Sequence, residues 1–375
     1  MTDQTYALSS LSILLTAVIL PILVKMLYDP SRKYAGYQVR DILHCKRNSE
    51  LRILMCIHRP DNVAAAIKLL ESSCPSRETP LAVYVLHLIE LIGRAYPIFI
   101  SHQVQKKTVS NTSYSENVIL AFNRFVRDNQ NGVSVNIFTA ICPPKLMHED
   151  TCTLALDKLT SLIILPFHRK WSIDGSIESE DSTVRTLNCS VLALSPCSVA
   201  ILVDRGSLSR SMVTPAESSF SIAMIFIGGN DDREALMFAK RMANDSNITL
   251  TVVRFVAIGN EELSNWDKVV DCEILKDVKL NNVGDEYVIY IEEMVKDGPQ
   301  TALIVRSMAD EYDLIIVGRR HNIVSPQTSG LAEWSEFPEL GIIGDLLASS
   351  DINSRTSVLV VQQQQLRIPS SKMRT

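Results

Sequence analysis

Residues 8–28 constrain this chain most, because no charged side chain occurs between Asp3 and Lys25 and most positions are Leu, Ile, Val or Ala. An apolar helix of about 20 residues rises about 30 Å, which matches the hydrocarbon thickness of a bilayer. A buried helix of a soluble protein and a cleaved signal peptide are the alternatives. The first rarely stays uncharged this long, and the second needs a basic start, where this chain has only Asp3. We therefore expect residues 1–28 to form a short tail and a membrane-spanning helix.

The orientation of that helix follows from the basic residues beside it. No Lys or Arg precedes the helix, whereas six lie near or after its C-terminal end: Lys25, Arg32, Lys33, Arg40, Lys46 and Arg47. Because the basic flank stays cytoplasmic, we expect an integral membrane protein whose remaining chain is cytosolic. Whether the membrane is an endomembrane or the plasma membrane stays open. In the cytosol, the sequons at Asn111, Asn188, Asn244 and Asn247 would not be glycosylated, and the eight cysteines are expected to be reduced.

Composition limits the partners of the cytosolic part. The chain has 375 residues, 46% of them hydrophobic and 21% charged, which is enough for two globular domains. Its net charge of −5 argues against nucleic acid as a partner. The local basic segment 29–49 is expected to be a juxtamembrane connector that meets anionic lipid headgroups of the bilayer.

Apolar and amphipathic segments alternate after this connector. Apolar runs that predict buried strands cover 50–57, 80–89, 133–141, 161–165 and 198–203, and helices are predicted over 62–73, 114–129 and 148–159. Buried strands that alternate with helices indicate a parallel sheet covered on both faces. We expect a doubly wound α/β domain over 50–206, with surface loops at 101–115 and in the acidic segment 175–182, the latter with phosphorylation as an alternative role.

The same pattern then starts again. Residues 207–219 are Ser-rich and predict a linker, after which 221–227, 231–242 and 248–257 repeat the order strand, helix, strand. Segment 161–171 parallels 313–322, and 198–206 parallels 357–365. Two tandem copies of one fold are the simplest interpretation, with the second domain over 220–365 and a polar tail over 366–375.

A nucleotide site is one hypothesis for the second domain. Ligands of parallel sheets bind at the carboxyl ends of strands, where the strand order reverses. Glycines allow backbone N–H groups to approach a phosphate, and arginines add charge-assisted hydrogen bonds. The candidate residues, in the loops after the first and fourth strands, are Gly228, Gly229, Asp231, Asp232, Gly318, Arg319, Arg320 and His321. The alternative, helix caps and ion pairs without a ligand, stays open because carboxylates repel phosphate.

No enzyme motif accompanies these loops. No glycine-rich dinucleotide or P-loop pattern follows a strand, and the histidines do not cluster with Cys or Asp at metal-ligand spacing, so we expect no enzyme, no metal and no cofactor other than ATP or a related nucleotide. His58, His168 and His321 each end a strand and are candidate sensors of cytosolic pH. His87, inside an apolar strand, is expected to be a core residue.

Several long segments carry a resemblance to a known family. They are VKMLYDPSRKYAGY, ELRILMCIHRPDNV, AVYVLHLIELIGRAYP, FIGGNDDREALMFAKRMA, DLIIVGRRHN and GLAEWSEFPELGIIGDLLASS. They resemble, in this order, the plant cation/proton exchangers of the monovalent cation:proton antiporter superfamily. The resemblance implies a membrane core that exchanges K⁺ or Na⁺ for H⁺, usually in a homodimer. It also implies a regulatory tail of two universal-stress-protein-like domains and a role in pH homeostasis.

This chain departs from the family in one respect. Ion exchange needs a titratable group at the membrane midplane, and residues 8–24 contain no carboxylate. We therefore expect the C-terminal regulatory region of an antiporter, a fragment or truncated product that is not transport-competent alone and works with a transport core. The alternative is a membrane-tethered, universal-stress-like protein that binds nucleotide or acts in signalling.

Overall fold

The computed structural model describes most of the chain. The described residues are 3–27, 39–45, 49–92, 96–102, 115–129, 132–172, 175–208, 219–258, 265–281, 287–321, 323, 325–352 and 354–365. The predicted tail 366–375 lies outside them, as do most of the connector 29–49 and of the linker 207–219. The boundaries of the predicted domains stay predictions.

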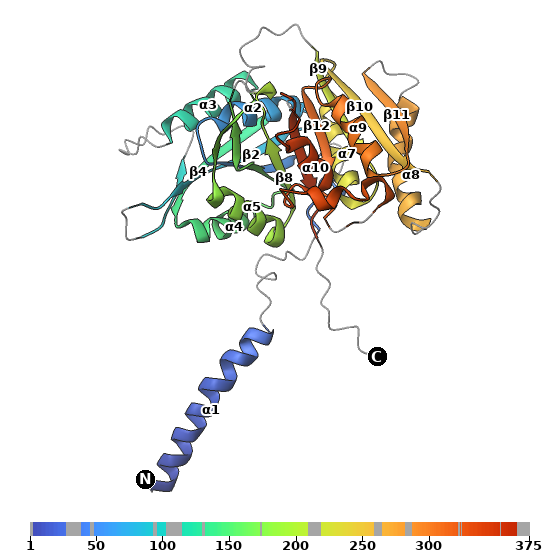
Figure 1. The fold of residues 1–375 in the computed structure, drawn as a ribbon. Coiled ribbons are helices and arrows are strands. Elements are labelled where there is room, and N and C mark those ends of the chain that lie inside the picture. The colour runs from blue at the N-terminus through green and yellow to red at the C-terminus, as the bar shows by residue number, and fades with distance from the viewer. Residues whose placement is uncertain are drawn as a thin grey trace.

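The first element is α1 (Asp3–Leu27), a helix of 25 residues that contains the predicted apolar stretch (Figure 1). Its polar side chains bond within the helix, since the Ser12 hydroxyl donates to the Ser9 carbonyl and the Thr16 hydroxyl donates to the Ser12 carbonyl. Large apolar side chains between residues 11 and 20 are exposed. Across the described residues, no helix reaches the combined length and apolarity that crossing a bilayer demands. The spanning role of this segment stays a prediction.

An α/β sheet fold follows, as predicted, and its strands and helices alternate through the first half. In chain order these are β1 (Leu51–Ile57), α2 (Asn62–Ser72), β2 (Leu81–Glu90), β3 (Ile98–His102), α3 (Glu116–Asp128), β4 (Val133–Cys142), α4 (Met147–Asp157), β5 (Leu162–Pro166), the hairpin β6 (Arg169–Trp171) and β7 (Ile177–Glu180), α5 (Ser182–Leu194) and β8 (Ser198–Val203). Two short segments differ from the prediction. Residues 101–102 belong to β3, and half of the acidic segment 175–182, Ile177–Glu180, is β7 rather than a loop.

The second half repeats the order of elements. It contains β9 (Phe220–Phe226), α7 (Asn230–Met242), β10 (Ile248–Ala257), α8 (Asn265–Asn281), β11 (Val288–Val295), α9 (Gly298–Met308), β12 (Leu314–Gly318), α10 (Gly341–Ala348) and β13 (Ser357–Gln362). Short 3-10 helices at Pro326–Thr328 and Leu331–Trp334 lie between β12 and α10.

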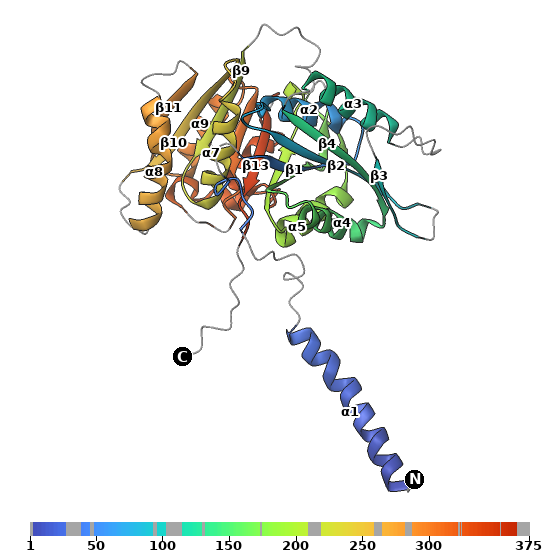
Figure 2. The ribbon, with the colours of Figure 1, turned by 180° about the vertical axis from the view of Figure 1, so that it is seen from behind.

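The two halves share a single sheet. Its eleven strands lie in the order β11-β10-β9-β12-β13-β8-β5-β1-β2-β4-β3. Outward from the middle, β8-β5-β1-β2-β4 and β13-β12-β9-β10-β11 are the same arrangement, and each is parallel throughout. The halves meet where β8 and β13 pair antiparallel, with Ile201 opposite Val360. The sequence did not predict this junction, which places the two halves side by side in Figures 1 and 2.

The core lies on both faces of this sheet and is continuous across the junction. Helices α2, α3, α7 and α8 contribute buried side chains to one face, including Phe122, Phe238 and Leu275. Helices α4, α5, α9 and α10 contribute to the other, including Leu154, Val191, Val305 and Leu347. Because each strand is apolar on both sides, the sheet can be covered twice, as expected for buried parallel strands.

Candidate functional site

Each half contains one point where the strand order reverses. In the first half the chain builds β1, β2 and β4 outward in one direction and then places β5 and β8 on the other side of β1. In the second half β9 and β12 flank the equivalent point. Ligands of open parallel sheets bind outside the carboxyl ends of such strand pairs. The two reversal points, β1/β5 and β9/β12, are therefore the places to compare.

At the β9/β12 point, the two predicted glycine and arginine loops are neighbours. The Arg320 backbone N–H donates to Asp231 Oδ2 at 2.8 Å, and its Nε–H donates to the Gly228 carbonyl at 3.1 Å. Arg320 Nε also lies 3.7 Å from Asp232 Oδ2. The doubly wound strand order explains why residues about 90 positions apart in the sequence meet here.

At the β9/β12 point, backbone N–H groups donate to carboxylates of the chain itself. Asp232 is buried and accepts the N–H groups of Ile227 at 2.9 Å and Gly228 at 2.7 Å. Asp231 accepts the Gln363 N–H at 2.8 Å. Burial raises the pKa of Asp232 to about 6, against the opposing attraction of Arg320. These contacts have the form of the cap and ion-pair alternative, and the nucleotide hypothesis stays untested.

The remaining predicted residues at the β9/β12 point are either packed against their neighbours or exposed. A Cβ atom on Gly318 would lie 2.1 Å from Asp232 Oδ1, so the absence of a side chain there allows the carboxylate to enter. Arg319 leaves the loop, because its guanidinium donates to Gln362 Oε1 and to the Pro338 carbonyl. His321 is largely exposed, and partial burial lowers its pKa.

At the β1/β5 point, the structure has a cavity of about 380 Å³ instead. Helix α2 begins here with no acidic residue in its first turn, unlike α7 with Asp231 and Asp232. Apolar side chains form one wall, among them Met55, Ile57, Ala65, Ala66, Ile164 and Leu202. Polar and aromatic side chains form the other, among them His58, Arg59, Lys170, Trp171, Asp181 and Arg205. The sequence prediction placed no binding site here, and among the lining residues it named only His58 and His168, as candidate pH sensors.

Most charges at this cavity are paired. Arg59 donates to the Ser179 hydroxyl at 2.7 Å and lies 3.4 Å from Asp181 Oδ2. Lys170 Nζ lies 2.7 Å from Asp61 Oδ2. The pKa of His58 is lowered to about 4 by burial, so its ring is neutral near pH 7. These pairs fix the rim of the cavity.

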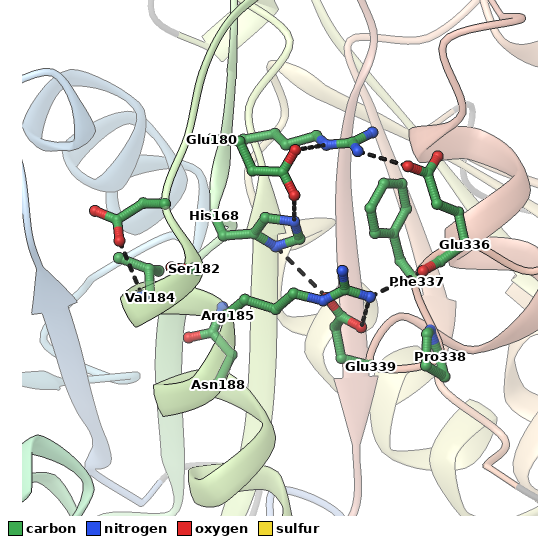
Figure 3. Close-up of polar contacts among 12 residues, drawn as sticks. His168, Glu180, Ser182, Val184, Arg185, Asn188, Glu336, Phe337, Pro338 and Glu339 are labelled. Carbon is green, nitrogen blue, oxygen red and sulfur yellow. Dashed lines mark hydrogen bonds and ion pairs between the residues drawn. The ribbon is translucent and has the colours of Figure 1, made fainter. Parts of the chain in front are cut away.

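His168 lies beside the cavity, where the two halves meet (Figure 3). Its fully buried ring is 3.5 Å from Glu180 on one side and 3.5 Å from Glu339 of the second half on the other. The pKa of His168 is lowered to about 4, mainly by burial and then by the charge of Arg185. As a candidate pH sensor, His168 would therefore titrate well below neutrality.

Arginines and an aromatic ring complete this contact between the halves, which we call the 336–339 latch after its second-half residues. Arg169 contacts Glu336 at 2.5 Å, and Arg185 contacts Glu339 at 3.0 Å. Phe337 is buried, and its ring packs edge-on to Phe167 and beneath the Arg169 guanidinium at 4.3 Å. Residues from β6, α5 and the loop before α10 thus form one cluster.

A second contact, which the sequence prediction missed, ties the segment after α1 to both halves. Glu234 of α7 is buried and accepts the backbone N–H groups of Ile42 at 2.6 Å and Leu43 at 2.9 Å. Ser198, at the start of β8, donates its backbone N–H to the Arg40 carbonyl. Burial raises the pKa of Glu234 to about 7, and hydrogen bonds from Ile42 oppose this. A charged residue next to the apolar positions of α7 was the available signal, although Asp231, Asp232 and Arg233 of the same helix are also buried.

Side chains of this segment also reach the end of the sheet. Asp41 is buried and accepts a hydrogen bond from the Gln363 side chain at 2.6 Å, while the Arg40 backbone N–H donates to Gln364. We call residues 40–43 with Glu234 and Gln363 the junction clasp. Within the described part of the chain, no cluster of three His, Cys, Asp or Glu side chains could hold a metal ion.

Comparison with known proteins identifies the family. Residues 219–362 match the model described as "Plant cation/H(+) antiporter, C-terminal domain", and residues 83–207 match "Plant cation/H(+) antiporter domain". The chain belongs to the plant cation/H⁺ antiporters. It is 49% identical over 378 residues to Cation/H(+) antiporter 3 of Arabidopsis thaliana, covering 97% of this chain and 46% of that protein. Cation/H(+) antiporter 10 of the same plant is 47% identical over 368 residues, covering 97% and 47%.

The chain therefore spans about half the length of the curated plant cation/H⁺ antiporters that it matches. Among solved structures, a universal stress protein from Archaeoglobus fulgidus aligns at a TM-score of 0.45 with 12% identity, covering 84% of this chain and 97% of that one. A putative universal stress protein from Pseudomonas aeruginosa aligns at 0.41 with 13% identity, covering 86% and 95%.

Proposed function

We propose that this chain is the C-terminal regulatory region of a monovalent cation/proton antiporter that exchanges K⁺ or Na⁺ for H⁺ and contributes to pH homeostasis. In this proposal α1 spans the membrane, the sheet lies in the cytosol, and the halves bias the conformation of a transport core. The family of the chain and the names of its relatives, cation/H⁺ antiporters, support the exchange reaction.

The observation that carries the regulatory role is the junction clasp. Residues 40–43, which follow α1 in the sequence, bond to β8 of the first half and to Glu234 and Gln363 of the second. A change in how the two halves pack would therefore act on the segment that leads back to α1. Allosteric coupling requires a structural element whose state is changed from both sides. We assign this role to the clasp, which contacts the two halves and the segment that leads back to α1.

The clasp also suggests which signal it responds to. Glu234 has a pKa of about 7, raised by burial, so its charge changes within the cytosolic pH range. When it is ionised, both carboxylate oxygens accept backbone N–H groups of the segment. Protonation weakens at least one of these acceptors, because a carboxylic acid accepts less strongly than a carboxylate. The pH sensor of this proposal is Glu234 rather than His58, His168 or His321.

Transport in yeast tests this function. The chain alone should not rescue a strain that lacks its own K⁺ and Na⁺ exporters, because its apolar stretch 8–24 offers no carboxylate to an ion. A chimera of Cation/H(+) antiporter 3 that carries this chain in place of its matching part should rescue growth. In that chimera Glu234→Gln should shift the pH dependence of exchange. Glu273→Gln, at an exposed position of α8, is the matched control.

Two outcomes would contradict the proposal. Rescue by the chain alone would show that exchange does not need a separate core. An unchanged pH profile in the Glu234→Gln chimera, with normal expression, would show that the clasp does not regulate exchange.

The nucleotide hypothesis has its own test. Labelled ATP should bind the wild-type chain and should not bind Arg320→Met if the β9/β12 loops hold a phosphate.

A further inference from the structure

The cavity at the β1/β5 reversal point is not used by the proposed regulation. Its volume of about 380 Å³ lies within the range of small-molecule sites, and it opens at the carboxyl ends of parallel strands. The equivalent point in the second half is filled by Asp231 and Asp232.

One wall of the cavity suits an apolar, flat group. The small side chains Ala65 and Ala66 of α2 are buried at this wall, together with Met55, Ile57 and Ile164 from the strand ends. The apolar wall therefore offers contact area without bulky side chains, which favours a planar ligand group over a branched one.

The polar side of the cavity carries a buried cation that forms no close ion pair. Arg205 is 6% exposed, and its Nη1 donates to the carbonyls of Leu347 and Ser349. Its Nε has no hydrogen-bond partner among the residues that the structure describes, and Asp310 attracts the guanidinium without forming a salt bridge with it. Burial lowers the pKa of Arg205. A buried guanidinium of this kind is stabilised by an anion.

Trp171 adds a second unused donor at the same wall. It is 8% exposed, its indole N–H lacks an acceptor within the described structure, and the Arg205 guanidinium lies 5.1 Å from its ring. Phe167 stacks against it with an interplanar angle of 11°. A buried N–H without a partner costs about 1–3 kcal/mol, which a ligand oxygen can recover. The wall thus presents two donors and an aromatic surface.

We propose that this cavity binds a small amphiphilic organic acid, in which a planar apolar body lies on the alanine wall and a carboxylate meets Arg205 and Trp171. The carboxylate supplies the acceptors that the guanidinium and the indole lack. A cation is disfavoured because Arg59, Lys170 and Arg205 all face the cavity. A dianion or polyphosphate is disfavoured because Asp61, Asp181 and Asp204 also line it.

Tryptophan fluorescence of the full chain in detergent tests the proposal. The chain has three tryptophans, and Trp266 and Trp334 are exposed, so a Trp266→Phe, Trp334→Phe background reports on Trp171 alone. The probe is 2-naphthoate, with uncharged 2-naphthamide of the same shape for comparison. We expect saturable quenching by 2-naphthoate, with binding roughly ten- to hundredfold weaker for the amide, since a hydrogen bond to a charged group contributes about 1.5–3 kcal/mol.

Two variants test whether the probe binds in the cavity or only in the detergent micelle. Ala66→Leu fills the alanine wall and should abolish the quenching, whereas Ala64→Leu, on the same helix but away from the cavity, should leave it unchanged. Arg205→Met should remove the preference for the acid over the amide while thermal unfolding reports whether the variant folds. Equal affinity for acid and amide in the wild-type pocket, or quenching that survives Ala66→Leu, would overturn the proposal.

Discussion

The two reversal points have the same strand order and opposite contents. In the second half, the first turn of α7 supplies Asp231 and Asp232, and Arg320 and the loop N–H groups surround them. In the first half, the first turn of α2 has no acid, its N-cap residue Asp61 pairs with Lys170, and a cavity is present. The backbone arrangement is thus compatible with either a closed or an open point. The side chains at the start of the helix differ between the two.

The halves also differ in their buried titratable groups. His58 and His87 of the first half each have a pKa lowered to about 4 by burial. Asp232 and Glu234 of the second have pKa values raised to about 6 and about 7 by burial. A buried base disfavours the folded state in acid, and a buried acid disfavours it as pH rises. The halves should therefore respond to pH in opposite directions.

The largest expected effect comes from cutting the 336–339 latch that joins the halves. Phe337→Ala removes a fully buried ring that packs on Phe167 and under Arg169. Such truncations cost about 3–5 kcal/mol. Chemical denaturation of the full chain should show the loss, and it should split into two transitions if the latch is what makes the halves unfold together.

Trp334→Ala is the matched control for the latch. This aromatic residue is three positions earlier and 86% exposed. Its removal should change the free energy of unfolding by about 0.5 kcal/mol or less. A comparable loss in both variants would mean that the loop as a whole, and not the Phe337 contact, stabilises the protein.

The next largest effect should come from disturbing the closed reversal point. In Gly318→Ala the new Cβ would lie 2.1 Å from Asp232 Oδ1 and 2.6 Å from its backbone N. Because backbone is involved, we expect a loss of about 3 kcal/mol, measured by thermal unfolding. Gly330→Ala has open space around its Cβ, although its φ of +79° is left-handed, and should cost about 1 kcal/mol.

The opposite pH responses can be sharpened at the junction clasp. The folded-state pKa of Glu234, about 7, is above its ordinary value, so the folded state binds the proton more tightly than the unfolded state. The contribution of Glu234 to the free energy of unfolding is therefore complete below about pH 4.5 and is lost as pH rises through about 7. Glu234→Gln should flatten this part of the stability–pH curve, by on the order of 1–3 kcal/mol across the window. Unfolding at fixed denaturant between pH 4.5 and 8 measures it.

The counterpart in the first half is His87→Gln. The pKa of His87 is lowered to about 4, so its contribution is complete above pH 6.5 and is lost as pH falls through about 4. Gln can keep a hydrogen bond to Ser115, which lies 2.9 Å from the ring nitrogen. This variant should flatten the acid side only. The comparison of the halves fails if both variants act on the same side.

The sequence was sufficient for most strands of the sheet. Apolar runs and helical periodicity located β1, β2, β4, β5 and β8 and, in the second half, β9, β10, β12 and β13, because burial on both faces leaves a strong local signal. Strand β11 was not located, because its side chains are largely exposed and it has no continuous apolar run. It did not reveal that β8 and β13 join the halves. Strand pairing across a junction depends on which edge stays uncovered, and both strands look like any other buried strand in the sequence.

The sites were harder to predict. The neighbouring loops at β9/β12 followed from topology, but their filling by Asp231 and Asp232 depends on side-chain direction. The open cavity depends on what is missing at Ala65 and Ala66, and no motif marks an absence. The clasp at Glu234 joins residues about 190 positions apart.

The smallest expected effect concerns the hairpin of β6 and β7, which the sequence analysis interpreted as an acidic loop. Its strands pair antiparallel, and Lys170 contacts Glu178 at 3.1 Å and Asp61 at 2.7 Å. Both contacts are largely exposed, so Lys170→Met should cost less than about 1 kcal/mol in unfolding. Added salt should reduce the difference further, because exposed ion pairs are screened. If the variant instead lost several kcal/mol, the hairpin would be a structural part of the first half, and the open cavity behind it would owe its shape to this ion pair rather than to the start of α2.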